Sequence, residues 1–187
     1  GPGFLAGHGM AGGRRSDPVG PWGRPSRRGE SSEAMRIVTR ADFDGVVCAV
    51  LLQDVEPVTV PTLWVEPSEM QQGRVAIQAC DIVANLPFHP AARLWFDHHY
   101  SNRPDQPFQG AFALSPSAAG VIHRDYAGRF SRDFSALVHQ TDRIDAAELT
   151  AEEVEHPERF PYVLVSMTIS GRRRGDEPYW NRLVRLL

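Results

Sequence analysis

The chain has 187 residues and a formal net charge of −3, which suits one or at most two soluble globular domains. Its two cysteines, Cys48 and Cys80, each lie within an apolar run, which indicates small core residues rather than a disulfide framework. No apolar stretch approaches the roughly 18 to 20 residues that span a bilayer, and no secretory signal is recognisable, so we expect a cytoplasmic protein with no membrane partner.

Residues 1–34 differ in composition from the rest of the chain. They contain nine of the 16 glycines and four of the 15 prolines, with almost no aliphatic periodicity, so we predict a disordered tail. Five arginines against three acids make this tail basic, which would allow contact with nucleic acid. Met35 stands directly before the first hydrophobic run, so we expect a natural start there, behind an upstream extension.

Hydrophobic runs after Met35 predict strands that alternate with helices. The predicted strands span residues 36–39, 61–65, 79–83, 93–97 and 111–114. The predicted helices span residues 46–52, 67–70, 118–126, a segment after 132, 152–156, 160–169 and 177–187. This alternation predicts an α/β fold with a parallel β-sheet sandwiched by helices.

The fourth predicted strand ends in the sequence Asp97-His98-His99. Ligands in α/β proteins gather at the carboxyl ends of strands, and carboxylate and imidazole bind manganese, zinc and iron without thiolates. The alternative is a strand end with a turn-forming acid and two solvated histidines.

Four other acids occupy comparable places. Asp42 and Asp44 lie in the loop between the first strand and helix, where helix capping is the alternative to metal binding. Asp81 interrupts an apolar strand, and its burial would be costly unless a cation or hydrogen bonds compensate it. Asp142 lies on a predicted helix, where a solvated face is the alternative.

Taken in order, these residues resemble the four motifs of the DHH phosphoesterase superfamily. Asp42-Phe43-Asp44-Gly45 is similar to motif one, Asp81 to motif two, Asp97-His98-His99 to motif three and Thr141-Asp142 to motif four. The superfamily includes RecJ-type exonucleases, cyclic-dinucleotide and nano-RNA phosphodiesterases, manganese pyrophosphatases and exopolyphosphatase-like proteins. The resemblance implies a DHH domain over residues 35–171.

The resemblance also implies a chemistry and a role for each residue. It implies hydrolysis of phosphodiester or phosphoanhydride bonds by a two-metal-activated water, acting on polyphosphate, a short oligonucleotide or a related phosphorylated small molecule. Two Mn²⁺ ions are expected, with Mg²⁺ as an alternative. The implied roles are Asp81 bridging both metals, Asp42 on the first, Asp44, His98 and Asp142 on the second, Asp97 orienting an imidazole, and His99 facing the substrate phosphate.

Two residues near motif one bear on the first metal site: Val38, which departs from the family pattern, and Arg40, which is a nearby cation. Val38 stands where many members carry a histidine four residues before Asp42, which would weaken the first metal site. Arg40 is the nearest cation, and we hypothesise that it supplies a fixed charge for phosphate. The alternative is that Arg40 pairs with Asp42 or Asp44.

In active members of this superfamily, a smaller substrate-binding domain with a Gly-Gly-His type motif usually follows the DHH domain. We expect this sequence to end before such a domain. Residues 172–187 read as a basic linker and the start of a truncated helix. Three options stay open: a fragment, a minimal protein that depends on a partner, or a catalytically weak or inactive domain that binds nucleotide or nucleic acid. The oligomeric state is open as well, with a homodimer as one option.

Overall fold

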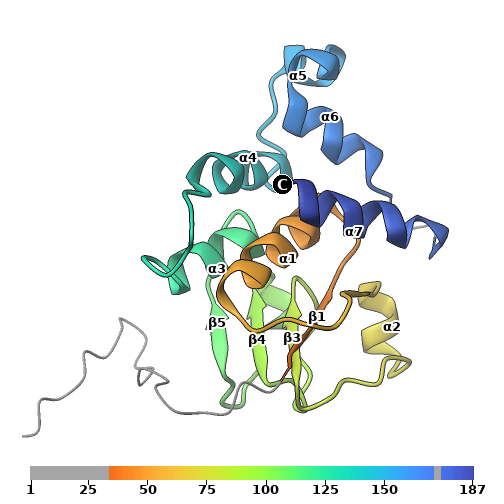
Figure 1. Ribbon diagram of the computed structural model, residues 1–187, viewed down its shortest axis with the longest axis vertical. Helices are drawn as coiled ribbons and strands as arrows, with labels where there is room; N and C mark the ends of the chain where they lie inside the picture. The colour runs from red at the N-terminus through yellow and green to blue at the C-terminus, as the bar shows by residue number, and fades with distance from the viewer. Residues whose placement is uncertain (1–33, 171–173) are drawn as a thin grey trace, which may run out of the picture. The chain divides into compact units, whose positions relative to one another are not determined.

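The computed structural model describes residues 34–170 and 174–187, and it contains a five-stranded parallel sheet (Figure 1). The strands are β1 (Arg36–Thr39), β2 (Leu63–Trp64), β3 (Asp81–Ala84), β4 (Leu94–Asp97) and β5 (Gly110–Phe112), in the spatial order β2-β1-β3-β4-β5. Every pair of neighbours is parallel. The predicted α/β class with a parallel sheet is therefore confirmed.

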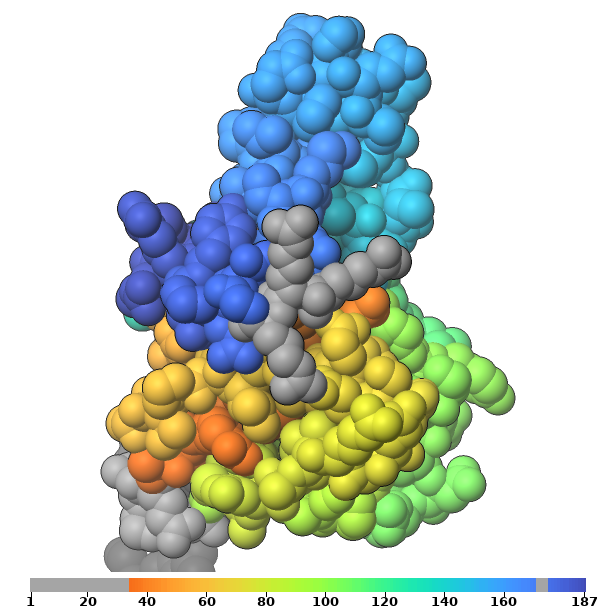
Figure 2. Space-filling model, turned by 90° about the vertical axis from the view of Figure 1, so that its right-hand side faces the viewer, coloured from red at the N-terminus to blue at the C-terminus, as the bar shows by residue number. Residues whose placement is uncertain are grey.

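Seven α-helices accompany the sheet within the described residues. They are α1 (Phe43–Val55), α2 (Pro67–Gln71), α3 (Ala118–Asp125), α4 (Ser135–Asp145), α5 (Ala151–Glu155), α6 (Pro161–Thr168) and α7 (Glu177–Leu186). Three short 3-10 turns complete the elements: η1 (Tyr100–Asn102), η2 (Pro157–Arg159) and η3 (Arg174–Asp176). Helix α1 contacts β1, α3, α4 and α7. Helices α5 and α6 project beyond this body, as Figure 2 shows for the segment around residue 160.

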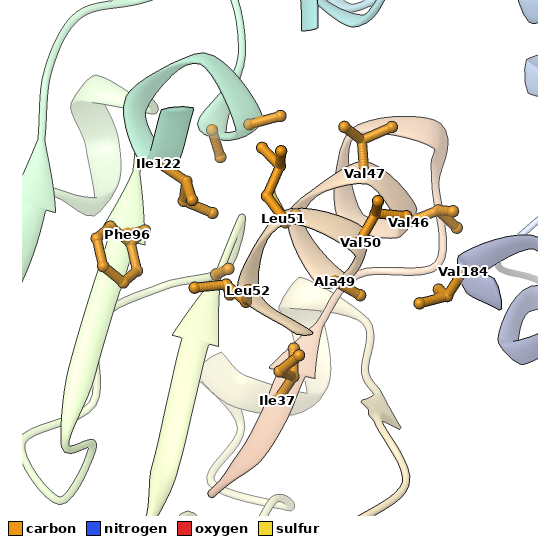
Figure 3. Packing of buried hydrophobic residues seen from close by; sticks show 14 of the residues in the cluster. Ile37, Val46, Val47, Ala49, Val50, Leu51, Leu52, Phe96, Ile122 and Val184 are labelled. Atoms are coloured by element: carbon orange, nitrogen blue, oxygen red, sulfur yellow. The ribbon is translucent and has the colours of Figure 1, made fainter. Parts of the chain in front are cut away.

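Helix α1 is the centre of the main core. Every residue from Phe43 to Leu52 is buried, and all of them except Asp44 and Gly45 are apolar, as expected for a helix packed between other elements. Leu51 and Leu52 lie toward Ile122 and Phe96, while Val46 lies toward Val184 of α7 (Figure 3). The helix begins where Asp42 caps it by accepting a hydrogen bond from the Gly45 amide.

A second apolar cluster covers the opposite face of the sheet. Its buried members are Val38, Val65, Val83, Leu86 and Trp95, and partly buried side chains from α2 and the neighbouring loops pack against them. Trp95 stacks on Phe112 with ring centroids 5.8 Å apart and donates a hydrogen bond from its indole nitrogen to the Leu86 carbonyl. This face is covered by one short helix and loops, whereas the other carries the long helices.

Most predicted element boundaries agree with the structure to within a few residues. One small difference changes the place of a candidate site residue: β3 begins two residues later than predicted. The first strand matches its predicted range, whereas β3 spans Asp81–Ala84 instead of residues 79–83. Asp81 is therefore the first residue of β3 rather than an interior one. The predicted tail at 1–34 lies almost wholly outside the described residues, as does most of the basic run at 172–174. No helix in the described part of the chain has the length and apolar character needed to cross a membrane.

Candidate metal centre

Polar side chains gather where β1, β3 and β4 end. Because parallel strands end at one edge of a sheet, the residues that follow them meet there. This edge receives Asp42 and Asp44 after β1, Asn85 after β3, Asp97 at the end of β4, and His98 and His99 directly after it. The last turn of α4 adds Asp145.

Asp44 is held by the N-terminus of α3. Its Oδ2 accepts a hydrogen bond from the Ala118 amide at 2.9 Å, and its Oδ1 accepts one from the Ala119 amide at 2.8 Å. The first amides of a helix lack intrahelical partners and favour a negative charge, so the site suits a carboxylate. Asp44 is buried, and these two bonds fix its orientation.

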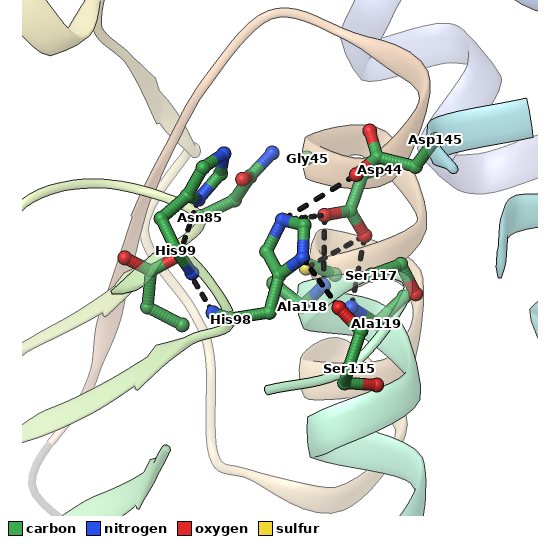
Figure 4. Close-up of polar contacts among 12 residues, drawn as sticks. Asp44, Gly45, Asn85, His98, His99, Ser115, Ser117, Ala118, Ala119 and Asp145 are labelled. Atoms are coloured by element: carbon green, nitrogen blue, oxygen red, sulfur yellow. Dashed lines mark hydrogen bonds and ion pairs between the residues drawn. The ribbon is translucent and has the colours of Figure 1, made fainter. Parts of the chain in front are cut away.

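His98 presents one ring nitrogen to two carboxylates (Figure 4). Its Nδ1 lies 2.9 Å from the carbonyl oxygen of Ser115, which can only accept, so Nδ1 carries the proton. The other nitrogen, Nε2, is buried, has no hydrogen-bond partner among the described residues, and lies 3.4 Å from Asp145 Oδ2 and 3.8 Å from Asp44 Oδ2. In the neutral imidazole, a lone pair thus faces one carboxyl oxygen from each of Asp145 and Asp44.

A divalent cation fits this arrangement. Asp44, His98 and Asp145 each offer one ligand atom, and the three atoms lie within 4.8 Å of one another. The imidazole side chain is 10% exposed, so its unpartnered nitrogen is turned away from water. Carboxylate oxygens with one imidazole nitrogen suit manganese, magnesium and zinc.

Burial and neighbouring carboxylates disfavour the charged forms of Asp44 and Asp145. Burial raises the pKa of Asp44 well above its ordinary value, and the nearby Asp145 and Asp42 raise it further, although the Ala118 and Ala119 amides lower it. Burial also raises the pKa of Asp145. A cation placed among these carboxylates would favour their ionised forms, and clusters of this kind are typical of functional sites.

Asp97 positions His99. Its Oδ1 accepts hydrogen bonds from His99 Nδ1 and from the His98 amide, each at 2.8 Å, and its Oδ2 accepts one from Asn102 Nδ2 at 2.7 Å. Asp97, His98 and His99 also bring three ligand atoms within 4.8 Å of one another. Since Asp97 and His99 already bond each other through those atoms, this group is a less suitable metal site than the first.

His99 has one nitrogen left for other partners. The hydrogen bond to Asp97 raises the pKa of His99, which favours the protonated ring. The side chain is 41% exposed, and with Nδ1 bound to Asp97 the Nε2 atom is the one that can donate outward. The predicted orienting role of Asp97 therefore has a geometric basis here, although the imidazole that it orients is that of His99 rather than that of His98.

Asp42 is engaged by three neighbours. Its Oδ1 accepts hydrogen bonds from the Gly45 amide at 2.8 Å and from Asn85 Nδ2 at 3.0 Å. Its Oδ2 lies 3.3 Å from Arg40 Nε. The capping role and the ion pair, both weighed as alternatives for these residues, are thus present in the structure.

Asp81 does not lie at this edge, which corrects its predicted role as a bridging metal ligand. It begins β3 and pairs in register with Arg36 at the amino ends of the strands. Arg36 Nε and Nη2 donate to its two oxygens at 2.8 and 2.7 Å, and the Gln78 amide donates to Oδ2 at 2.8 Å. Four residues of strand, or about 13 Å, separate Asp81 from the carboxyl end of β3. Asn85 stands at that end instead.

The predicted role of Asp142 as a metal ligand stays a prediction. Its Oδ1 accepts a hydrogen bond from Ser117 Oγ at 2.6 Å, next to the start of α3. Asp145, one helical turn later, faces His98. The signal that could have found Asp145 is its spacing of four residues from the buried Thr141 on α4.

Comparisons with known proteins include a similar solved structure. No protein-family model matches the chain. No curated protein matches it either. A solved structure described as the pGpG-specific phosphodiesterase PggH from Vibrio cholerae is similar, with a TM-score of 0.67 and 32% sequence identity. The match covers 81% of this chain and 51% of that chain, so this chain spans about half the length of that protein.

Proposed function

We propose that this chain is a phosphoesterase domain of the DHH superfamily that hydrolyses phosphodiester bonds with the help of a divalent cation, Mn²⁺ first and Mg²⁺ as the alternative. Two independent findings support the proposal. The motif residues Asp44, His98 and His99 meet at one edge of a parallel sheet. The similar structure is that of a phosphodiesterase.

The substrate that we propose is a short linear nucleotide such as pGpG. The similar structure is described as specific for pGpG, and that compound contains the phosphodiester bond that the proposed chemistry would cleave. Polyphosphate contains only phosphoanhydride bonds, so it is the less supported of the substrates that the sequence suggested.

Three residues would hold the cation, and others would act on the phosphate. Asp44, His98 and Asp145 provide the ligand atoms. A bound divalent cation would polarise a phosphoryl oxygen and lower the pKa of a water molecule. His99, whose protonated form the hydrogen bond to Asp97 favours, would donate from Nε2 to a phosphate oxygen, because its Nδ1 is already bonded to Asp97.

The observation that carries the proposal is the unpartnered Nε2 of His98. A buried polar atom without a partner costs free energy, and this one faces two carboxylates that would repel its lone pair. A cation bound between Nε2, Asp44 and Asp145 would satisfy all three groups together.

A second candidate is a domain that binds nucleotide without turning it over. The observation that favours it is that Asn85, at the end of β3, is neutral, while Asp81, to which the resemblance gives the bridging role, is bound to Arg36 at the other end. Such a domain would keep the phosphate-facing His99 and the fold.

An activity assay on the full chain separates the two candidates. The protein is stripped of metal, restored with Mn²⁺, and assayed on pGpG, a short oligonucleotide, an aryl phosphodiester and polyphosphate. We expect Mn²⁺-dependent turnover of pGpG, its loss in His98→Ala, and its retention in Glu155→Gln, which changes an exposed acid on α5. Binding of pGpG without turnover of any substrate would favour the second candidate.

A further inference from the structure

We infer that this chain holds one divalent cation, at Asp44, His98 and Asp145, and that Asn85, Asp42 and Arg40 close the place of a second. The inference deepens the proposed function and rests on it for the expectation that a cation binds at all. It departs from the two-metal centre that the sequence resemblance implies.

The first step concerns the lone pairs of Asp42. Both oxygens are engaged: Oδ1 by two N–H donors, from Gly45 and Asn85, and Oδ2 by the Arg40 guanidinium. Arginine stays protonated in proteins, so this cation cannot be discharged to admit a metal. A second metal on Asp42 would have to displace a permanent positive charge.

The second step concerns Asn85. It ends the strand run in the left-handed region, with φ of 54°, a conformation that asparagine adopts more readily than most residues. Its Nδ2 donates toward Asp42, so the amide presents N–H to the carboxylate on that side. An amide carries no negative charge, and the nearest acid of the same strand, Asp81, is bound to Arg36 at its other end. No carboxylate of β3 is therefore placed to bridge two metals.

The third step concerns Val38. This side chain has no ligand atom, is fully buried, and belongs to the apolar cluster on the opposite face of the sheet. The histidine that the resemblance implies at this position is therefore replaced by a core residue. Val38 has no ligand atom, and both oxygens of Asp42 are engaged, so neither residue offers a free ligand to the first of the two implied metal positions.

The fourth step is the balance of formal charges. Asp44 and Asp145 together balance one divalent cation, and Asp42 is balanced by Arg40. A second divalent cation would add two positive charges beside Arg40, and the remaining carboxylate of this edge, Asp97, is already bonded to His99 and Asn102. Like charges within a few ångströms in a partly buried site repel strongly.

The test counts the bound ions. The full chain is stripped with a chelator and titrated with Mn²⁺ by equilibrium dialysis, and the bound ions are examined by electron paramagnetic resonance. We expect one Mn²⁺ per chain and the spectrum of an isolated ion. Two ions per chain with an exchange-coupled spectrum, or no bound ion, would overturn the inference.

Two variants sharpen the test. Asn85→Asp restores a carboxylate at the end of β3, and we expect it to bind a second Mn²⁺, whereas Glu155→Gln keeps a stoichiometry of one. If Asn85→Asp folds, as its thermal melt would show, and still binds one ion, Asn85 is not what closes the second position and the inference fails in that part.

The metal stoichiometry tests the inference, and the activity tests the proposed function, so each can be refuted without the other. One bound Mn²⁺ without turnover of pGpG or any other phosphodiester would remove the proposed function and leave the inference intact. Turnover with two bound ions would leave the proposed function and overturn the inference.

Discussion

Asp81 and Arg36 form a two-pronged ion pair at the amino ends of β3 and β1, with N–O distances of 2.7 and 2.8 Å. The carboxylate is fully buried and the guanidinium side chain is 19% exposed. This pair compensates the buried acid that begins β3, at the end of the sheet opposite the candidate metal centre. The compensation that the sequence left open, cation or hydrogen bonds, is thus a side-chain ion pair.

Asp81→Asn is expected to lower stability without lowering Mn²⁺ affinity. It leaves the largely buried guanidinium of Arg36 without its charge partner, which costs about 3 kcal/mol, the lower end for a broken buried pair, because Arg36 keeps some contact with water. Urea unfolding measures the stability, and Mn²⁺ titration measures the affinity. Asp105→Asn, at an exposed acid, is the control, and weaker Mn²⁺ binding in folded Asp81→Asn would contradict our placement of this residue.

Asp145→Ala and Asp142→Ala form a matched pair one helical turn apart. Asp145→Ala removes a proposed ligand, so Mn²⁺ affinity should fall at least about tenfold, the scale that outer-shell partners alone can reach. Asp142→Ala removes the acceptor of Ser117 Oγ and should cost about 1 kcal/mol of stability with little change in affinity. Calorimetric Mn²⁺ titration and urea unfolding of both variants check this, and the reverse pattern would restore Asp142 as the ligand.

Gly45→Ala is expected to disturb the loop that carries Asp42 and Asp44. A Cβ atom at position 45 would lie 1.9 Å from the carbonyl oxygen of Arg40, which is backbone and must move with its loop. The overpacking should lower the free energy of unfolding by about 1–3 kcal/mol. It should also weaken Mn²⁺ binding, because the two carboxylates shift with the loop. Gly175→Ala, where a Cβ meets nothing within 4 Å, is the control. Unchanged thermal stability in Gly45→Ala would argue against the loop as described.

Glu153 gives a pH dependence that does not involve the metal centre. Arg143 donates to both of its oxygens at 2.7 Å, and the Thr150 amide adds a bond that caps α5. These contacts lower the pKa of Glu153 from 4.5 to about 2. A lowered pKa in the folded state means that the stabilisation is present above pH 4.5 and is lost as the pH falls through about 2.

Glu153→Gln should therefore flatten the stability profile in acid. Wild-type protein should lose stability more steeply than the variant between pH 4.5 and about 2, and the two should differ most near neutral pH. Urea midpoints measured across this range test the prediction. Parallel profiles for the two proteins would show that the Arg143 pair does not lower this pKa.

The sequence predicted the fold class and the edge where the site lies, because both follow from hydrophobic periodicity and from the order of strands and helices. It predicted Asp44, His98 and His99 as members of one cluster, and the structure brings them together. Their roles as ligands and phosphate contacts stay predictions that metal and activity measurements must test.

Asp81 and Asp142 show what hydrophobic periodicity cannot decide. The strand β3 begins two residues later than predicted, so Asp81 lies at its amino end and not in its interior. On α4, Asp142 and Asp145 are one turn apart, and only tertiary packing determines which of them faces His98. Asn85 was missed because an asparagine after a strand has the ordinary explanation of a turn residue.

The most direct test is the anomalous diffraction of crystals grown with Mn²⁺. We predict one anomalous peak per chain, within coordination distance of His98 Nε2 and of carboxylate oxygens from Asp44 and Asp145. An anomalous peak within coordination distance of Asp81 or Asp142 instead, or no peak beside His98 at saturating Mn²⁺, would contradict the claim that Asp44, His98 and Asp145 bind one Mn²⁺.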